Sequence, residues 1–301
     1  MRSTNIQLPG GSGPASELFS FKLEPGAGAC AHALEALGSA ARERWMVRGA
    51  VRRGAHGRFD EALGDAYAML SCAVAIEPET DLRALTRTLY GELLERIVAL
   101  GYPQLVRVWN HIPEINRGRG DDEVYRQFCW GRAEAFDRFD GPLPAATGTG
   151  SGDGVLRICL LAATGAVELT HLENPRQISA FHYPREYGPR SPSFARATKV
   201  QADGAAVLLI SGTASIVNHE ALHAGDLTEQ ICETARNVRC LQAHAPELQP
   251  LAVRYYLRHA ADQALLLARF GENFPSHPAP VVIPSELCRD DLLAEIELVL
   301  G

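Results

Sequence analysis

The chain has 301 residues, of which 46% are hydrophobic and 22% are charged, and its formal net charge is −7. This composition is typical of a globular protein with a sizeable core and excludes a disordered chain. The acidic excess argues against nucleic-acid binding, and no apolar run approaches the roughly 20 residues of a membrane helix. The N-terminus lacks the order of a signal peptide, and the seven cysteines include no CxxC pair. We therefore expect a cytoplasmic protein with reduced thiols and no membrane or nucleic-acid partner.

The first part of the chain predicts a mixture of strands and helices. Residues 1–20 are rich in Gly, Ser and Pro and predict a loose N-terminal segment. Asp81 is a suitable N-cap for a helix that Gly101 ends. The periodicity predicts strands at 45–51, 68–76 and 105–112 and helices at 83–100 and 123–139.

The second part repeats this order after a break in composition. Residues 141–154 are Gly-rich and predict a linker or turn, and a hairpin is expected over 155–172. Asp226 is a suitable N-cap for the next helix. Further predictions are strands at 205–217, 251–258 and 292–300 and helices at 227–245 and 260–274.

Both parts contain a helix, a strand and a second helix, which indicates two αβα units of the same design. The predicted fold class is α/β (α+β), with two halves packed side by side and mixed sheets carrying helices on one face. The expected division is a loose segment at 1–20, an N-terminal half at 21–145 and a C-terminal half at 146–301.

The segment from His219 to His223 reads HEALH and matches the zinc-protease pattern HExxH. That chemistry needs both histidines on one face of a long helix. Here Gly225 and Asp226 indicate a helix that begins after the motif. The sequence therefore predicts no metal site, with a zinc hydrolase kept as a rival hypothesis.

Arg132 is the first candidate site residue. In the helix predicted at 123–139 it shares a stripe with Tyr125, Phe128 and Phe136, at spacings of three and four residues. An inward guanidinium needs an anionic partner, because an unpaired buried charge is costly. The partner is either a buried carboxylate of the protein or a bound ligand.

A stiff loop supplies the second candidate. The run from Tyr183 to Pro192 contains three prolines, which restrict the backbone around Tyr187 and Arg190. Such a loop is suited to hold a ligand carboxylate through Arg190, and an exposed surface loop is the alternative.

The last predicted strand is the third candidate. Alternation places Glu295 and Glu297 on one face, opposite Ala294 and Ile296. The face is either solvated or lines a cleft, where a carboxyl with a raised pKa acts as a general acid. Cys288 is expected near the beginning of this strand.

The C-terminal half, from AAVLLISG to LLAEIE, resembles the RidA-like superfamily of imine deaminases in element order and in the closing strand. Those enzymes carry a carboxylate-binding arginine at the position of Pro280, so the resemblance extends to the fold and not to imine deamination.

From about residue 100 onward the chain looks like the chorismatase family, whose members release pyruvate from chorismate and share the RidA-like architecture. The resemblance rests on RVWNHIPEIN, YRQFCWGRAEAF, PAATGTG, ENPRQISAFHYPREYGPRSPSFARA, LISGTASIVNHE and CRDDLLAEIE. It implies no cofactor and a proton transfer from Glu295 to the enolpyruvyl methylene. The substrate contacts it implies are Arg132 and Arg190 to the two carboxylates, hydrogen bonds from Tyr125, Tyr183 and Tyr187, and close backbone approach at Gly212, Thr213 and Ala214.

The resemblance also suggests a product. The family members that form 3-hydroxybenzoate carry a cysteine seven residues before the catalytic glutamate, and Cys288 matches it. We expect 3-hydroxybenzoate, with 4-hydroxybenzoate as a possible second product. The alternatives are hydrolysis to a dihydroxycyclohexadiene carboxylate and a binding module without turnover. A monomer or a trimer is expected.

Overall fold

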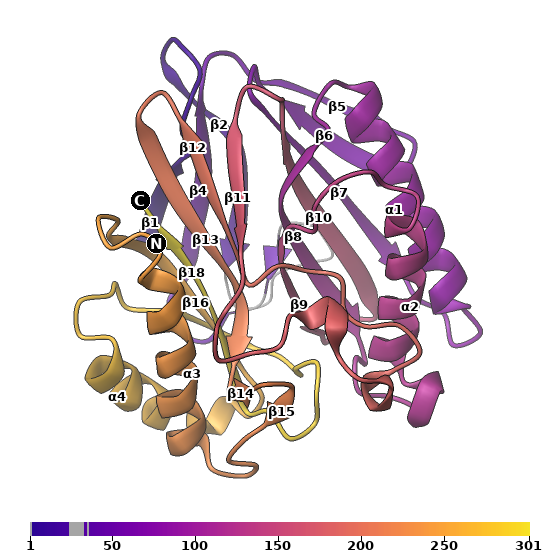
Figure 1. Ribbon diagram of the computed structural model, residues 1–301, viewed down its shortest axis with the longest axis vertical. Helices are drawn as coiled ribbons and strands as arrows, with labels where there is room; N and C mark the ends of the chain where they lie inside the picture. Colours follow the sequence, from indigo (N-terminus) through magenta and orange to yellow (C-terminus); the bar gives the residue numbers. More distant parts are fainter. Residues whose placement is uncertain (1, 24–32, 35) are drawn as a thin grey trace.

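The computed structural model describes residues 2–23, 33–34 and 36–301 (Figure 1). Cys30 lies outside these residues, and the six described cysteines are free thiols. None of the described helices is long and apolar enough to cross a membrane.

Two six-stranded sheets form the body of the protein and have the same strand order. The first sheet has the order β5-β6-β7-β10-β8-β9, and the second has the order β11-β12-β13-β18-β16-β17. The strands of the first are β5 (Arg52–His56), β6 (Phe59–Leu63), β7 (Tyr67–Ala75), β8 (Gln104–Pro113), β9 (Ala145–Ser151) and β10 (Val155–Ala163). The strands of the second are β11 (Glu168–Leu172), β12 (Ala197–Ala202), β13 (Ala205–Ala214), β16 (Pro250–Leu257), β17 (Val281–Pro284) and β18 (Ala294–Leu300).

Each sheet carries two helices on its outer face (Figure 1). Asp81 and Asp226 cap the first helix of each pair by accepting hydrogen bonds from Ala84 N and Glu229 N. The helices are α1 (Leu82–Ala99) and α2 (Val124–Phe136) on the first sheet and α3 (Leu227–Gln242) and α4 (Gln263–Asn273) on the second. The predicted α/β class with two equivalent halves is confirmed.

A smaller sheet with the order β1-β4-β2-β3 lies at the N-terminus. Its strands are β1 (Arg2–Gln7), β2 (Ala15–Leu23), β3 (Ala33–Leu34) and β4 (Ala41–Arg48). The prediction of a loose segment at 1–20 is wrong, because β1 pairs with β4 and buries Ile6. Two further strands, β14 (Ile216–Val217) and β15 (Glu220–Ala221), form a hairpin. Single 3-10 turns are η1 (Gly120–Asp122), η2 (Ala180–His182), η3 (Arg185–Tyr187) and η4 (Ala260–Asp262).

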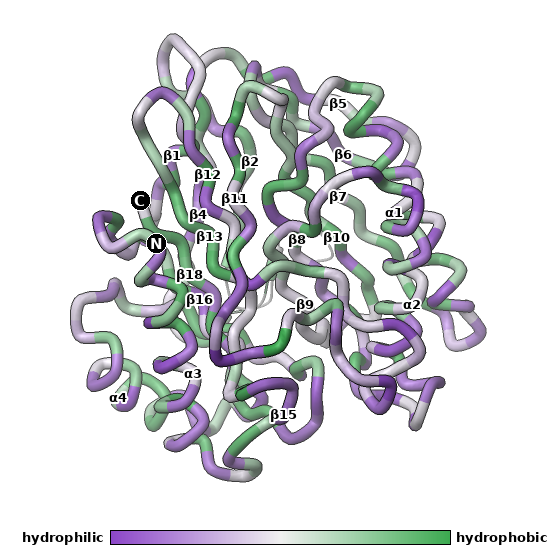
Figure 2. Tube along the Cα trace, viewed as in Figure 1, coloured by the Kyte–Doolittle hydropathy of each residue, from purple (hydrophilic) through white to green (hydrophobic). Residues whose placement is uncertain are grey.

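The core has three parts. One lies under α1 and α2, one under α3 and α4, and a central one joins the inner faces of both large sheets to the N-terminal sheet. Trp45 and Trp109 meet at its centre, with ring centroids 5.3 Å apart. Figure 2 shows hydrophobic residues along the inner strands, while the helices alternate between hydrophobic and hydrophilic positions.

The boundary between the halves differs from the prediction at 145. Residues 145–151 form β9, which pairs in parallel with β8, so they are neither linker nor turn. The expected hairpin over 155–172 is also wrong, since β10 lies inside the first sheet and β11 at the edge of the second. The chain therefore passes between the sheets after Ala163. Local patterns do not reveal this, because sheet membership depends on long-range pairing.

Candidate active site

A cavity of about 650 Å³ lies between the two halves. Its walls come from β9 and α2 of the first half and from β13, β18 and the segment before β18 in the second. This size is in the usual range of small-molecule sites.

Glu295 lies on one wall of this cavity, only 4% exposed. Strand alternation on β18 directs Glu295 and Glu297 into the space between the sheets, while Ala294 and Ile296 pack under the helices. Burial, with the nearby Glu297 carboxylate, raises the pKa of Glu295 to about 8. At neutral pH this carboxyl is a neutral acid.

Gly212 on β13 provides the space for this acid. A Cβ atom there would lie 2.1 Å from Glu295 Oε1, well inside contact distance. The β13–β18 register shifts between Ile210 and Thr213, where the extra backbone lets the Glu295 carboxyl rest against the glycine.

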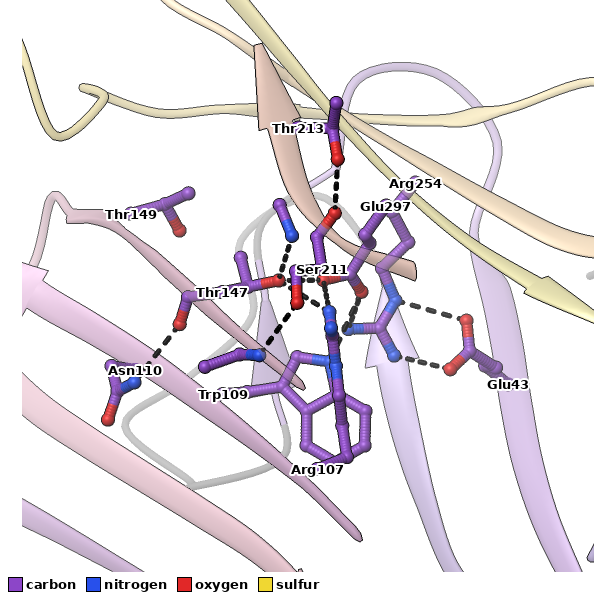
Figure 3. A network of polar contacts seen from close by, with 12 residues as sticks. Glu43, Arg107, Trp109, Asn110, Thr147, Thr149, Ser211, Thr213, Arg254 and Glu297 are labelled. Carbon is purple, nitrogen blue, oxygen red and sulfur yellow. Dashed lines mark hydrogen bonds and ion pairs between the residues drawn. The ribbon is translucent and has the colours of Figure 1, made fainter. Parts of the chain in front are cut away.

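Glu297 occupies a dense polar network beside the cavity (Figure 3). Its carboxylate receives Thr147 Oγ1 at 2.6 Å, Arg107 Nη2 at 2.9 Å and Trp109 Nε1 at 3.2 Å. Arg254 Nη1 lies 3.0 Å from the same carboxylate. Burial alone would raise the pKa of Glu297, but Arg254 and Arg107 hold it below its usual value.

Arg132 lines the cavity and is 4% exposed. Its guanidinium carbon lies 5.2 Å from the ring centroid of Tyr90 and 5.0 Å from that of Phe136. Its Nε and Nη2 are buried without hydrogen-bond partners, and no described carboxylate forms an ion pair with it. The alternative of a structural ion pair is therefore not realised among the described residues.

Four further arginines line the cavity and were not singled out in the sequence: Arg119, Arg126, Arg196 and Arg289. Arg196 is 3% exposed and donates from Nη2 to Tyr183 Oη at 2.9 Å. Arg289 lies over the ring of Tyr187, 4.0 Å from its centroid. Arg196 and Arg289 follow no periodic pattern, since the first comes just before a strand and the second lies in an irregular segment.

Cys288 lines the wall between Glu295 and α2, near Tyr125 and Cys129. Burial, together with the Glu295 charge, raises the pKa of the Cys288 thiol to about 12. Burial likewise raises the pKa of Tyr125. Both groups are neutral at physiological pH, so Cys288 is not a thiolate nucleophile.

Comparison with known proteins shows the family of this chain. Residues 43–162 match the family described as "Chorismatase FkbO/Hyg5-like, N-terminal". A "3-hydroxybenzoate synthase" of Streptomyces hygroscopicus is 39% identical over 249 residues, covering 76% of this chain and 73% of that protein. A "Chorismatase" of Streptomyces rapamycinicus is 36% identical over 277 residues, covering 86% of this chain and 82% of that protein. The chain belongs to the chorismatase family.

The fold of this chorismatase agrees with a solved relative. A crystal structure of a chorismatase superposes with a TM-score of 0.77 at 27% identity and covers 100% of this chain and 92% of that one. The resemblance stated from the sequence is therefore confirmed for the family and for the fold.

The structure brings most of the predicted site residues of this chorismatase to one cavity. Its lining includes Glu295, Cys288, Arg132, Tyr125, Tyr183, Tyr187, Gly212 and Ala214. Two of the predicted residues, Arg190 and Thr213, are not part of this lining. Arg190 does not line the cavity, because its guanidinium forms a bidentate ion pair with exposed Asp137. Thr213 points to the other side of β13, where its hydroxyl donates to the Ser211 carbonyl.

The HEALH segment is not a helix. Glu220 and Ala221 form β15, and His223 has a φ of 61°. The ring of His219 packs against Tyr187, with centroids 5.6 Å apart. The described residues contain no group of three or more His, Cys, Asp or Glu side chains placed to hold a metal ion. The helical geometry that the zinc hypothesis needs is absent from this segment.

Proposed function

We propose that this chorismatase cleaves the enolpyruvyl ether of chorismate, releasing pyruvate and forming 3-hydroxybenzoate. The observation that carries the proposal is a neutral buried acid, Glu295, in a cavity that also contains the unpaired guanidinium of Arg132. Chorismate is a dianion with an acid-sensitive enol ether, and it matches both features.

Glu295 acts as the general acid in this scheme. Its proton goes to the enolpyruvyl methylene, and the electron pair of that double bond forms the new C–H bond. The ether carbon becomes an oxocarbenium-like centre, which the ring hydroxyl attacks. The bond between the ring and the attacking oxygen then breaks, and the ring loses the C–H proton beside the ether oxygen and aromatises. Pyruvate leaves with the attacking oxygen as its ketone oxygen, the ether oxygen stays on the ring as the phenol, and the C–H proton returns to Glu295. Pyruvate and hydroxybenzoate together contain all the atoms of chorismate, so no cofactor or co-reactant is required.

The arginines bind the two carboxylates. Arg132, Arg196 and Arg289 all line the cavity that contains Glu295 and supply cationic groups for this purpose. A guanidinium fork matches a carboxylate in a bidentate geometry. Tyr125, Tyr183 and Tyr187 supply further hydrogen bonds, and Gly212 and Ala214 let the backbone approach the substrate.

The neutral wall formed by Cys288, Tyr125 and Cys129 supports the intramolecular route. A thiol and a phenol with raised pKa values offer no base to activate water beside Glu295. We propose on this basis that the ring hydroxyl, rather than water, is the nucleophile. The six free thiols support the further proposal of a cytoplasmic location.

Incubation with chorismate and chromatography of the products test the function. Pyruvate with 3-hydroxybenzoate in equal amounts is expected. Pyruvate with a non-aromatic diene diol would show that water is the nucleophile and would overturn the role given to Cys288. If chorismate binds but is not consumed, the protein is a binding module without catalytic activity.

Replacement of the acid tests the mechanism. Glu295→Gln keeps the shape but cannot donate the proton, so kcat is expected to fall by about two orders of magnitude or more. Glu61→Gln is the matched control, since Glu61 is a buried carboxylate paired with Arg96 outside the cavity. A kcat near the wild-type value for Glu295→Gln would remove Glu295 from the reaction.

The same variant has a stability readout. The folded pKa of about 8 lies above the ordinary 4.5, so folding of the wild type weakens as pH rises through this window. Glu295→Gln is therefore expected to unfold at a higher temperature than wild type at pH 8 and at an equal temperature below about pH 4. Thermal unfolding at both pH values separates loss of chemistry from loss of fold.

A further inference from the structure

The neutral state of Glu295 depends on where the charges beside it are fixed. The two carboxyls of β18 face the same inter-sheet space, two residues apart on one strand. Two buried carboxylates at this spacing disfavour each other's ionised form, so the pair tends to keep one proton. The surrounding contacts decide which carboxyl holds it.

The hydrogen bonds of the Thr147 hydroxyl show that Glu297 is the ionised carboxyl. The hydroxyl accepts hydrogen bonds from Arg107 Nη2 at 2.6 Å and from Gly212 N at 3.2 Å, and neither of these groups can accept. Its single proton is therefore left for Glu297 Oε2, at 2.6 Å. Glu297 must accept there, as it must from Trp109 and Arg107. A proton on Glu297 would face only donors.

Glu295 has the opposite surroundings. Among the residues that the structure describes, none donates a hydrogen bond to its carboxyl. Charge balance agrees: the ion pairs of Arg254 with Glu43 and Glu297, and of Arg107 with Glu297, join two buried cations to two buried anions. A charge on Glu295 would be an additional buried anion in this cluster. The proton of the pair therefore belongs to Glu295.

Other groups face Glu295 without reversing this balance. Arg107 and Arg196 favour its ionised form, but Arg107 is held by Glu297 and Thr147, and Arg196 by the Ile178 carbonyl and Tyr183. Tyr125 and Cys288 also interact with Glu295, and both are neutral. Arg132 and Arg289 line the same cavity, but neither is among the charges that shift the pKa of Glu295.

The N-terminal sheet completes the arrangement. Glu43 on β4 accepts hydrogen bonds from Arg254 Nε at 3.0 Å and Nη2 at 2.5 Å, and from Trp45 Nε1 at 2.8 Å. These contacts leave Arg254 Nη1 directed toward Glu297 (Figure 3). The sheet at the start of the chain thus orients a cation beside the carboxylate on β18.

We propose that Glu297 is a positioning residue for the reaction: as a permanently ionised carboxylate, fixed by Thr147, Arg107 and the Glu43–Arg254 pair, it keeps the proton on Glu295. This inference rests on the proposed function for its catalytic meaning. It also makes a statement about the free protein, namely which of the two carboxyls is protonated.

The test compares Glu297→Gln with Glu61→Gln. Both remove a buried carboxylate that pairs with an arginine, but only the first removes a charge beside Glu295, since Glu61 pairs with Arg96 outside the cavity. In Glu297→Gln the alkaline limb of kcat/KM is expected to move down by about one pH unit or more. A shift of one unit lowers kcat/KM about fivefold relative to wild type at pH 8, with little change near pH 6. Glu61→Gln is expected to lose stability and keep the limb in place.

A purely structural role for Glu297 predicts a different result, an equal loss at pH 6 and pH 8 with an unmoved limb, and this outcome would overturn the proposal. Neutron diffraction of the unaltered protein at neutral pD gives a second decision, which does not depend on the folding of Glu297→Gln. A deuteron on Glu295 and none on Glu297 is expected, and the reverse would also overturn it. If chorismate is not cleaved, the proposed function fails, while the neutron result still decides the protonation of the pair.

Discussion

Arg132 is a buried cation that the free protein leaves unpaired. Packing between Tyr90 and Phe136 offsets part of the cost, but two of its nitrogens have no hydrogen-bond partner. Such a side chain lowers the stability of the free enzyme and strengthens the binding of an anion. At the scale of single residues, stability and binding are in opposition here.

Arg132→Met tests this opposition. Methionine fills a similar volume without charge, so we expect the melting temperature to rise by a few degrees and KM for chorismate to rise about tenfold or more. Arg83→Met is the matched control on the neighbouring helix, because Arg83 is paired with Glu134 and stacked on Trp130. Differential scanning calorimetry and steady-state kinetics check both effects. A lower melting temperature with an unchanged KM would show that Arg132 is a structural residue.

At the scale of elements, the site depends on two neighbouring strands, β13 and β18, which pair with each other. Strand β18 carries Glu295 and Glu297. On β13, Gly212 leaves room for the Glu295 carboxyl, and its backbone N–H donates a hydrogen bond to Thr147 Oγ1. The glycine has no need of a left-handed backbone; its role is to admit the carboxyl. Any side chain at this position competes with Glu295 for the same volume.

Gly212→Ala is expected to displace the Glu295 carboxyl and reduce kcat about a hundredfold, by loss of proton-transfer geometry. The fold should persist, since the atom displaced is the end of a flexible side chain. Gly165→Ala is the control, because a Cβ atom there meets nothing within 4 Å. Kinetics with circular dichroism checks the prediction. Wild-type kcat in Gly212→Ala would contradict the close approach.

At the scale of the whole molecule, one loop of the second half is fastened to the first half. Arg185 forms an ion pair with Asp121 before α2, and Arg190 forms one with Asp137 at its end. Tyr187 lies between these two arginines in the chain and Tyr183 lies just before them, and both tyrosines line the cavity. The ion pairs are exposed, so each is expected to be weak and sensitive to salt.

Arg190→Ala therefore should raise KM by less than about tenfold, through a less ordered loop and not through a lost ligand contact. Exchange of the pair, Arg190→Asp with Asp137→Arg, is expected to restore most of the affinity. A direct carboxylate contact would not be restored by the exchange. Steady-state kinetics at low and high salt measures both variants. The oligomeric state, monomer or trimer, stays a prediction that analytical ultracentrifugation measures.

Local patterns in the sequence predicted the long helices, several strands and much of the candidate site. Periodicity and capping at Asp81 and Asp226 predicted the four long helices, because these signals are local. Alternation placed Glu295 and Glu297 on one face of a strand, and helical spacing directed Arg132 inward. The long motifs indicated the chorismatase family, which the comparisons confirm.

Only the tertiary structure decided how these parts meet. Strands β9 and β10 belong to the first sheet because of pairings that no local pattern encodes, and β1 is ordered because β4 lies beside it. Arg190 and Arg196 lie close together in one proline-rich stretch, yet only Arg196 reaches the cavity, since Asp137 holds Arg190 outside. The pKa of Glu297 is lowered by Arg107, Thr147 and Arg254, which are far away in the chain, while burial and Glu297 raise that of Glu295. The state of a buried carboxyl depends on its neighbours in space, and the sequence lists only its neighbours along the chain.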